Sequence, residues 1–342
     1  MKRVTVVRMD ALERIVCRIT GATHASRSDS IQSLWSGYGE LLRMDLSGFS
    51  QPQVIVKHVE PKVANQHTNR NYDEISHARK LRYYSVEKTW YEQYAIECGT
   101  DCRIPSKFGL FEQGNHWVFV LEDLDLAGFT RRVTSPNHAE IQAVLRWLAA
   151  FHATYLGRDV PGLWPCGSYW HLGTRRNELP RITDGYLRKS ATLFDNRLNG
   201  AAYKTMVHGD AKIDNFCFLD RTYTSNDKPP SPSSVAAVDF QYVGGGCGMR
   251  DIAYFFSSVW SPEECSVLAE EALEYYFGQL GFFVRRMQPL IDPAKVRDDW
   301  EPLYAFAWAD FYRFLCGWAP GHYDDDPYAK SMVRQAFASR EP

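Results

Sequence analysis

VHGDAKIDNF, residues 207–216, leads directly into an apolar segment, 216–219, that predicts a short strand. A second apolar run, 235–238, ends at Asp239. The two segments together place an acid in a polar loop, an amide five residues later and a second acid at the end of a buried strand. Phosphoryl transfer from Mg·ATP requires these groups in this arrangement. The stretch therefore predicts a catalytic loop followed by a metal-binding strand pair.

Each polar side chain of this region has a predicted task. Asp210 is the candidate catalytic base or aligning carboxylate, because an acceptor-only group can hold a hydroxyl in line with the γ-phosphate. Asn215 and Asp239 are candidate magnesium ligands, the amide adding an oxygen without a second full charge. Lys212 can offset the charge that develops on the transferring phosphoryl group. We interpret His208 as a residue that braces the loop through hydrogen bonds.

Length and composition indicate two lobes of an ordinary soluble protein. At 342 residues the chain is too long for one small core. Its formal net charge of -2 provides no electrostatic footprint for nucleic acid or an anionic membrane. Apolar runs are too short for a membrane span, and the first residues lack a signal-peptide core. We therefore expect a cytoplasmic protein, and no obligate protein partner is evident.

The eight cysteines do not predict a disulfide framework in a chain of this length. Several stand in apolar contexts, for example Cys217 and Cys316, which favours buried and reduced thiols. Cys98 and Cys102 form the only close pair. They are a poor candidate for a zinc site, because no second pair or histidine stands nearby.

Hydrophobic periodicity predicts an opening helix over 9–19 that Gly21 ends. The pattern then predicts a small antiparallel sheet and one long helix: strands separated by a glycine turn within 31–46, a strand at 54–59, a helix over 73–97 and strands at 108–112 and 117–121.

From 136 onward the pattern becomes mainly helical. We predict an amphipathic helix over 136–155, started by Ser135 and Pro136. The lobe boundary is placed accordingly, with an N-lobe over 1–124 and a C-lobe over 125–342. The Pro/Ser-rich segment 226–234 is predicted to be a surface insertion between the two strands that carry the chemistry.

The chain resembles the aminoglycoside phosphotransferase and choline kinase branch of the protein-kinase-like fold, in particular the ecdysteroid-kinase-like small-molecule kinases. The resemblance rests on His208-Gly209-Asp210 with Asn215 and on Asp239-Phe240-Gln241, and covers roughly residues 30–320. It implies a bilobal α+β fold with a small antiparallel β-sheet N-lobe and a larger, mainly helical C-lobe. It further implies ATP and Mg²⁺ as cofactors. Gly209 stands where protein kinases have Arg, which argues against a protein kinase.

The resemblance implies a lysine on a strand that pairs with the α/β-phosphates. Lys57, at the end of an apolar strand run, corresponds to it. A helix glutamate should orient this lysine, and we assign that role to Glu87, with Glu74 and Glu92 as rivals.

Backbone elements of a nucleotide site are implied as well. Gly37 and Gly39 resemble the loop that covers the phosphates, although the third glycine is missing and a plain hairpin turn is the alternative. The segment Glu122-Asp123-Leu124 resembles the hinge whose backbone binds adenine. The alternative is that its two acids simply cap the preceding strand. Asp251 resembles the acid that buttresses the catalytic loop from below.

The acceptor is the least determined part. One predicted helical face is aromatic, with Trp300, Tyr304, Trp308, Phe311 and Tyr312. Core packing is the default interpretation of such a stripe, and the alternative is an aromatic wall for the acceptor, assisted by Asp310 or the acidic run 324–326. We hypothesise an ATP- and Mg²⁺-dependent phosphotransferase acting on a hydroxyl of a small molecule. The alternative is a catalytically silent nucleotide-binding protein of the same fold.

Overall fold

The computed structural model describes residues 10–34, 37–61, 74–220 and 234–339. By its internal contacts the chain divides into two compact units, Met1–Lys88 with Pro105–Thr130, and Thr89–Ile104 with Arg131–Pro342. The predicted Pro/Ser-rich insertion lies almost entirely outside the described residues.

The predicted division had a single boundary between residues 124 and 125, and the observed division differs from it. The first unit continues past Leu124, whose carbonyl accepts hydrogen bonds from the N–H groups of Ala127 (3.1 Å) and Phe129 (2.9 Å) in a turn. The segment 89–104, expected in the N-lobe, packs with the second unit. Trp90 stacks on Phe240 with ring centroids 4.5 Å apart. Large aromatic side chains thus decide to which core this segment belongs.

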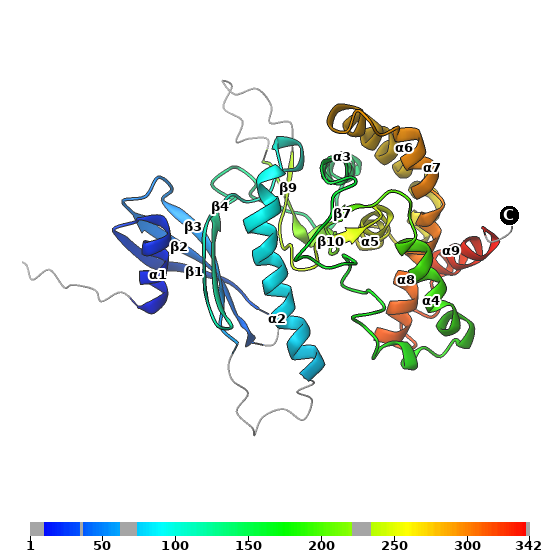
Figure 1. Cartoon of the computed structure of the whole chain (residues 1–342), viewed down its shortest axis with the longest axis horizontal. Coiled ribbons are helices and arrows are strands. Elements are labelled where there is room, and N and C mark those ends of the chain that lie inside the picture. Colours follow the sequence, from blue (N-terminus) through cyan, green and yellow to red (C-terminus); the bar gives the residue numbers. More distant parts are fainter. Residues whose placement is uncertain (1–9, 35–36, 62–73, 221–233, 340–342) are drawn as a thin grey trace, which may run out of the picture. The chain divides into compact units, whose positions relative to one another are not determined.

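The first unit is built on a five-stranded antiparallel sheet, which confirms the predicted sheet (Figure 1). Its strands in spatial order are β1 (His24–Ser33), β2 (Gly39–Ser47), β3 (Gln53–Val59), β5 (His116–Glu122) and β4 (Lys107–Gln113). β1 begins well before the predicted 31. Most of its side chains are polar and exposed, so backbone pairing with β2 holds it without any apolar alternation to reveal it.

Helices cover both faces of this sheet (Figure 1). α1 (Ala11–Thr20) begins at an Asp10 capping box and ends at Gly21, whose φ is 77°. Its buried side chains pack with alternate strand residues such as Val54 and Val56. α2 (Glu74–Thr89) lies on the opposite face. The long predicted helix stops at Thr89 and continues as a π-helical turn, Trp90–Tyr94, and a 3₁₀ turn, Ala95–Glu97.

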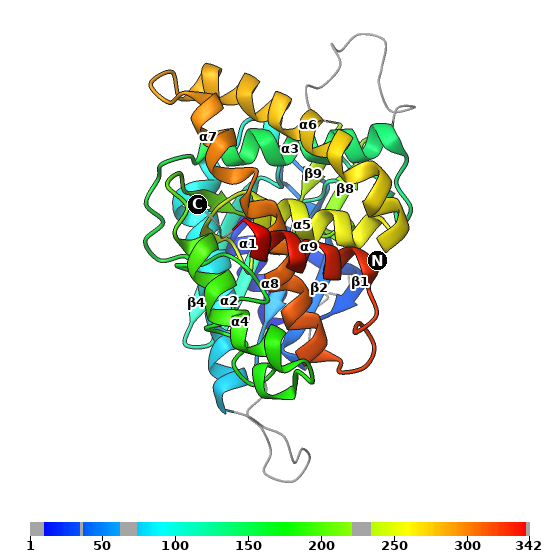
Figure 2. The same cartoon turned by 90° about the vertical axis from the view of Figure 1, so that its right-hand side faces the viewer.

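The second unit is mainly helical, as predicted (Figure 2). Its helices are α3 (His138–Thr154), α4 (Gly185–Asn199), α5 (Met249–Val259), α6 (Pro262–Met287), α7 (Pro293–Trp300), α8 (Leu303–Trp318) and α9 (Pro327–Ala338). α3 begins two residues later than predicted. Asn137 caps it in a capping box with Glu140, so Ser135 and Pro136 precede the helix. Among the described residues, no helix is both long and apolar enough to cross a membrane.

Short strands hold the polar loops of this unit. β7 (Thr205–Val207) pairs with β10 (Gly244–Gly246), and β8 (Phe216–Phe218) pairs with β9 (Val235–Ala237) and β6 (Arg131–Arg132). The predicted strands at 216–219 and 235–238 are therefore a paired antiparallel ladder. The α+β fold class predicted from the sequence is confirmed.

α8 is buried over nearly its whole length and packs against α4, α5 and α9 (Figure 2). A helix that is apolar all round belongs in the centre of a bundle. The predicted aromatic stripe is accordingly part of the core: Trp300, Tyr304, Trp308, Phe311 and Tyr312 are all buried. Trp300 ends α7, so it does not share a helix with the others.

Candidate active site

The loop between β7 and β8 turns at Gly209. Its φ is +77°, and a Cβ atom there would lie 2.3 Å from the carbonyl oxygen of Tyr242. Both the backbone angle and the missing space require glycine. The same steric limit explains why no arginine stands at this position.

Asp251 of α5 holds this turn from beneath. Its fully buried carboxylate accepts hydrogen bonds from the backbone N–H groups of His208 (2.6 Å) and Gly209 (2.9 Å). Nε2 of His152 lies 3.1 Å from the same carboxylate. These contacts are what a buttress of the loop needs, and the partners offset the cost of burying the carboxylate.

His208 is itself fully buried within the loop. Its Nδ1 accepts a hydrogen bond from the N–H of Asp210 at 3.3 Å, and its Nε2 lies 3.0 Å from the carbonyl oxygen of Val238. This pattern suits the neutral ring with its proton on Nε2. Burial lowers the pKa of His208, which also favours the neutral form. The contacts are those of a bracing residue.

Asp210 and Asn215 are in direct contact. The Asn215 amide donates to the Asp210 carbonyl oxygen at 2.7 Å and to its carboxylate at 3.0 Å. Burial and, next, the charge of Asp239 raise the pKa of Asp210 to about 7, against the opposing effects of Lys212 and the hydrogen bonds to this carboxyl. Strongly perturbed carboxyls of this kind are concentrated at functional sites.

Asp239 immediately follows Val238, whose N–H donates to the Asn215 carbonyl oxygen at 2.9 Å. Among the described residues, it is the one non-glycine residue with positive φ, at 66°. Such strain costs on the order of 1–3 kcal/mol and persists where the surroundings impose it, often at functional sites. Asp239 is half-buried and acts electrostatically on Asp210, so the structure brings the two acids and the amide together.

Lys212 lies at the start of the 3₁₀ turn η6 (Ile213–Asn215). Its side chain is about one-third exposed, and its Nζ lies 3.9 Å from the carboxylate of Asp214. The ammonium is close enough to Asp210 to lower the pKa of that carboxyl. A partly exposed and loosely paired lysine remains available to an incoming anion.

Lys57 of β3 pairs with Glu87 of α2 in the first unit. Their Nζ and Oε2 atoms are 2.7 Å apart, and both side chains are buried. Glu87, the assigned partner, therefore contacts Lys57. Glu92 lies in the π-helical turn that packs with the second unit, and the side chain of Glu74 is outside the described residues.

Gly37 and Gly39 close the hairpin between β1 and β2, where Gly37 has a φ of +70°. A Cβ on Gly39 would lie 1.9 Å from the carbonyl oxygen of His58, so close packing against β3 requires this glycine. Ser36, between β1 and these glycines, lies outside the described residues. The turn geometry thus explains both glycines without a ligand.

The predicted hinge residues are largely engaged within the first unit. The Asp123 carboxylate accepts from Arg43 at 2.6 Å, and the Glu122 carboxylate accepts from the N–H of Ser106 at 2.9 Å. The N–H of Glu122 donates to the Ser106 carbonyl oxygen, and the carbonyl of Leu124 accepts from the turn that follows it. Adenine would therefore have to use other backbone atoms of this segment.

Residues 167–288 match the ecdysteroid kinase-like family. The match confirms the resemblance over the segment that contains the loop at 207–216, Asp239 and Asp251. It spans well under half of the chain. No curated protein sequence matches this chain.

Solved structures of several small-molecule kinases are distantly similar to this chain. A microcompartment-associated aminopropanol kinase is 14% identical, covering 92% of this chain and 90% of that chain, with a TM-score of 0.44. A choline kinase from Cryptosporidium parvum Iowa II is 11% identical, covering 90% and 87%, with a TM-score of 0.42. A type VIII aminoglycoside-3'-phosphotransferase is 14% identical, covering 91% and 98%, also with a TM-score of 0.42. Similarity this distant says nothing about what the chain acts on.

Sequence patterns did not reveal two tyrosines beside the loop of the ecdysteroid kinase-like segment. The hydroxyl of Tyr254 is close enough to Asp210 to lower the pKa of that carboxyl, and the N–H of Tyr169 donates to the carbonyl oxygen of Gly209 at 3.1 Å. The two rings contact each other, and Tyr254 also packs on Phe311. Tyr254 lies one helical turn after Asp251 on α5, but no local pattern identifies it as a neighbour of Asp210.

The predicted acidic helpers of an acceptor are engaged elsewhere. The fully buried carboxylate of Asp310 pairs with Arg250 at 3.3 Å and with Arg313 at 2.8 Å, so it has no free face for a substrate. In the acidic run, Asp326 caps α9 and Asp325 pairs with Lys330. Core packing, the default interpretation of the aromatic stripe, is therefore confirmed, and the alternative of an aromatic wall assisted by Asp310 is not supported.

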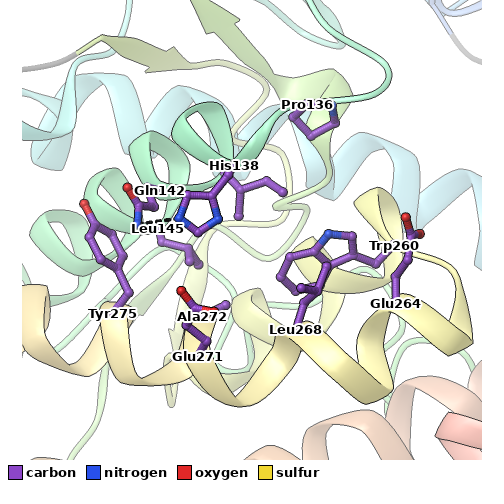
Figure 3. Close-up of a pocket in the computed structure, with 11 residues that line it drawn as sticks. Pro136, His138, Gln142, Leu145, Trp260, Glu264, Leu268, Glu271, Ala272 and Tyr275 are labelled. Atoms are coloured by element: carbon purple, nitrogen blue, oxygen red, sulfur yellow. Dashed lines mark hydrogen bonds between the residues drawn. The ribbon is translucent and has the colours of Figure 1, made fainter.

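A cavity of about 300 Å³ lies between α3 and α6 (Figure 3). Apolar side chains such as Leu145, Trp260 and Leu268 line it. Three of its polar lining groups are used locally, since His138 contacts Gln142 and Glu264 completes the capping box of α6. None of the predicted site residues lines this cavity, so it is not the site described above.

Gly209→Ala is expected to destabilise the protein by about 1–3 kcal/mol, because the new Cβ meets Tyr242 and the left-handed conformation disfavours alanine. Gly278→Ala is the matched control. It lies inside α6 with open space around it and should stabilise by about 0.5–1 kcal/mol. Urea denaturation of both variants measures the difference, and equal midpoints would contradict the steric argument.

Proposed function

We propose that this protein is an ATP- and Mg²⁺-dependent phosphotransferase that phosphorylates a hydroxyl group of a small molecule. The observation that carries the proposal is the buried Asp210 carboxyl, held against the Asn215 amide and perturbed by Asp239. A polar turn without chemistry has no reason to bury one carboxyl, place another beside it and strain the backbone of the second.

Asp210 would accept a hydrogen bond from the acceptor hydroxyl and hold it for in-line attack. Tyr254 would orient that carboxylate through its hydroxyl. Lys212 would stabilise the negative charge that develops on the transferring group. In the first unit, Lys57 would bind the phosphates in an orientation set by Glu87.

Asn215 and Asp239 would hold the magnesium ion. Their donors are an amide oxygen and a carboxylate, the hard oxygen ligands that Mg²⁺ prefers. Asn215 donates to Asp210 through its Nδ2, so its Oδ1 is the atom suited to a metal. When bound, Mg²⁺ neutralises triphosphate charge. Gly37, Gly39 and the backbone of 122–124 are proposed to contribute N–H or carbonyl groups to the nucleotide.

We propose the cytoplasm as its location. All eight cysteines are in the reduced state, which suits a reducing compartment. The formal net charge of -2 offers no general attraction for nucleic acid, so a small molecule is the proposed partner.

The pH dependence of the reaction is expected to report Asp210. A carboxyl with a pKa of about 7 is ionised above that pH and neutral below it, and only the ionised form accepts the proton of the substrate. We expect kcat/KM to rise from pH 6 to a plateau near pH 8, with a slope of about tenfold per pH unit at the acidic end. A profile that is flat between pH 5 and pH 8 would contradict this assignment.

The function is tested by ADP release across a library of small alcohols, sugars and amino-alcohols, with Mg·ATP supplied. The proposal expects at least one acceptor to stimulate ADP release and to appear as a phosphate monoester by mass spectrometry. A Mg·ATP-dependent thermal shift without turnover on any acceptor would favour a silent nucleotide-binding protein. If neither a thermal shift nor turnover is observed, both the phosphotransferase and the silent nucleotide-binding protein are overturned.

A further inference from the structure

A sulfur, a nitrogen and an oxygen ligand gather in the second unit at some distance along the chain from the loop at 207–216. Cys166, His171 and Asp195 each offer one ligand atom, and these three atoms lie within 4.8 Å of one another. Cys166 and His171 belong to the segment after Leu163, and Asp195 belongs to α4. Only the fold brings them together.

The segment that carries two of these ligands is firmly held. The N–H of Gly167 donates to the Gly245 carbonyl oxygen at 2.8 Å, and a Cβ on Gly167 would lie 2.7 Å from the backbone nitrogen of Gly244. The N–H of His171 donates to the Ser168 carbonyl oxygen. A ligand set on a fixed backbone loses little entropy when it binds an ion.

One carboxylate oxygen in this cluster lacks a proper hydrogen-bond partner. Asp195 Oδ1 is sealed from solvent, and none of the residues that the structure describes donates a hydrogen bond to it. Its neighbours are Nε2 of His171 at 3.3 Å and a guanidinium nitrogen of Arg250 at 3.7 Å. A sealed carboxylate oxygen without a donor is costly, and a metal ion would satisfy it.

A cation bound at this cluster would lie near the positively charged guanidinium of Arg250. It is fully buried, but its guanidinium is already paired with Asp310 at 3.3 Å and hydrogen-bonded to Asn199 at 3.2 Å. Arg313 forms a second ion pair with Asp310. Asp195 therefore offsets the surplus positive charge of the two arginines.

We propose that Cys166, His171 and Asp195 form a binding site for a zinc ion. Thiolate, imidazole and carboxylate are the three ligand types that zinc accepts, whereas Mg²⁺ and Ca²⁺ prefer oxygen alone. Three protein ligands leave a fourth tetrahedral position for a water molecule. The ion would tie the 166–171 segment to α4.

One backbone hydrogen bond links this site to the candidate active site. Tyr169, between two of the zinc ligands, donates its N–H to the Gly209 carbonyl oxygen at 3.1 Å. Zinc would therefore stiffen a support of the loop that contains Asp210. The proposal does not depend on phosphoryl transfer, because metal binding can be measured without any nucleotide or acceptor.

The test uses the full chain, freed of metal by a chelator, with Mg²⁺ and nucleotide absent. Co²⁺ replaces the spectroscopically silent Zn²⁺ as the probe. We expect saturation at one equivalent, with thiolate-to-cobalt charge-transfer absorption and intense visible bands of a tetrahedral site. Stoichiometric Zn²⁺ should abolish these bands, and excess Mg²⁺ should not.

Three variants assign the ligands. Cys166→Ser should lose the charge-transfer absorption, and Asp195→Asn should bind Co²⁺ about tenfold more weakly. Cys265→Ser, which alters another buried thiol in α6, should behave as the wild type.

Absence of saturable Co²⁺ binding by the wild type would overturn the proposal, as would charge-transfer absorption that persists in Cys166→Ser. Should Cys166→Ser fail to fold by circular dichroism, the comparison of wild type with Asp195→Asn decides. Equal Co²⁺ affinities of these two proteins would then overturn the site.

Discussion

Asp210→Asn is expected to lower kcat by roughly 10²–10⁴-fold while leaving Mg·ATP binding intact. The amide keeps the size of the side chain and its contact with Asn215, but it cannot accept the proton of an acceptor hydroxyl. Steady-state ADP release measures the loss, and calorimetric titration with a non-hydrolysable ATP analogue measures binding. A variant that turns over at the wild-type rate would falsify the role given to Asp210.

Stability distinguishes this catalytic effect from unfolding. The folded pKa of Asp210 lies above its ordinary value, so its contribution to stability is present below pH 4 and is lost as the pH rises through about 7. At pH 8 the uncharged amide of the Asp210→Asn variant avoids the buried charge, and we expect a melting temperature at or above that of the wild type. Asp214→Asn, which alters an exposed acid of the same turn, is the control and should change neither activity nor stability noticeably.

Lys57→Met is expected to destabilise the protein by about 3–5 kcal/mol, because it removes the ammonium that pairs with the buried Glu87 carboxylate. The double variant Lys57→Met/Glu87→Met should recover most of this loss, since both charges are then gone. Chemical denaturation of the single and double variants measures the coupling. Lys88→Met removes a more exposed pair with Glu112 in the same unit, and it should cost less than about 1 kcal/mol.

The same double variant separates structure from function at Lys57. If this lysine binds phosphate, the double variant should remain inactive although its stability has returned. Recovery of both stability and ADP release would show that the pair is structural only. Recovery of neither would point to damage in the sheet itself.

The candidate site was partly predictable because its parts are close along the chain. Asp210 and Asn215 are five residues apart, so one turn brings their side chains together. Gly209 could be expected at a sharp turn, although the carbonyl of Tyr242 that excludes a side chain could not. The antiparallel strands were readable where one face is apolar, and β1 was missed in part because its polar side chains carry no such signal.

Other features depend on contacts between distant segments. The contact of Glu87 with Lys57 follows from the packing of α2 on the sheet, whereas the sequence alone left Glu74 and Glu92 open as well. The sequence left Asp310 open as a contact for a substrate. In the structure its carboxylate forms buried ion pairs with Arg250 and Arg313. Periodicity could not show whether the aromatic residues of α8 belong to the core or line a pocket. An aromatic stripe on one helical face is expected in either case.

By itself the sequence determined the α+β class, the antiparallel sheet and the loop with its acids and amide. These follow from short-range rules: side-chain alternation, turn sterics and hydrogen bonds between residues a few positions apart. Only the tertiary structure decided that Lys57 contacts Glu87 and that the carboxylate of Asp310 is paired with arginines. It also decided that Cys166, His171 and Asp195 lie together in one cluster. Such encounters depend on how whole elements pack, and spacing along the chain does not encode them.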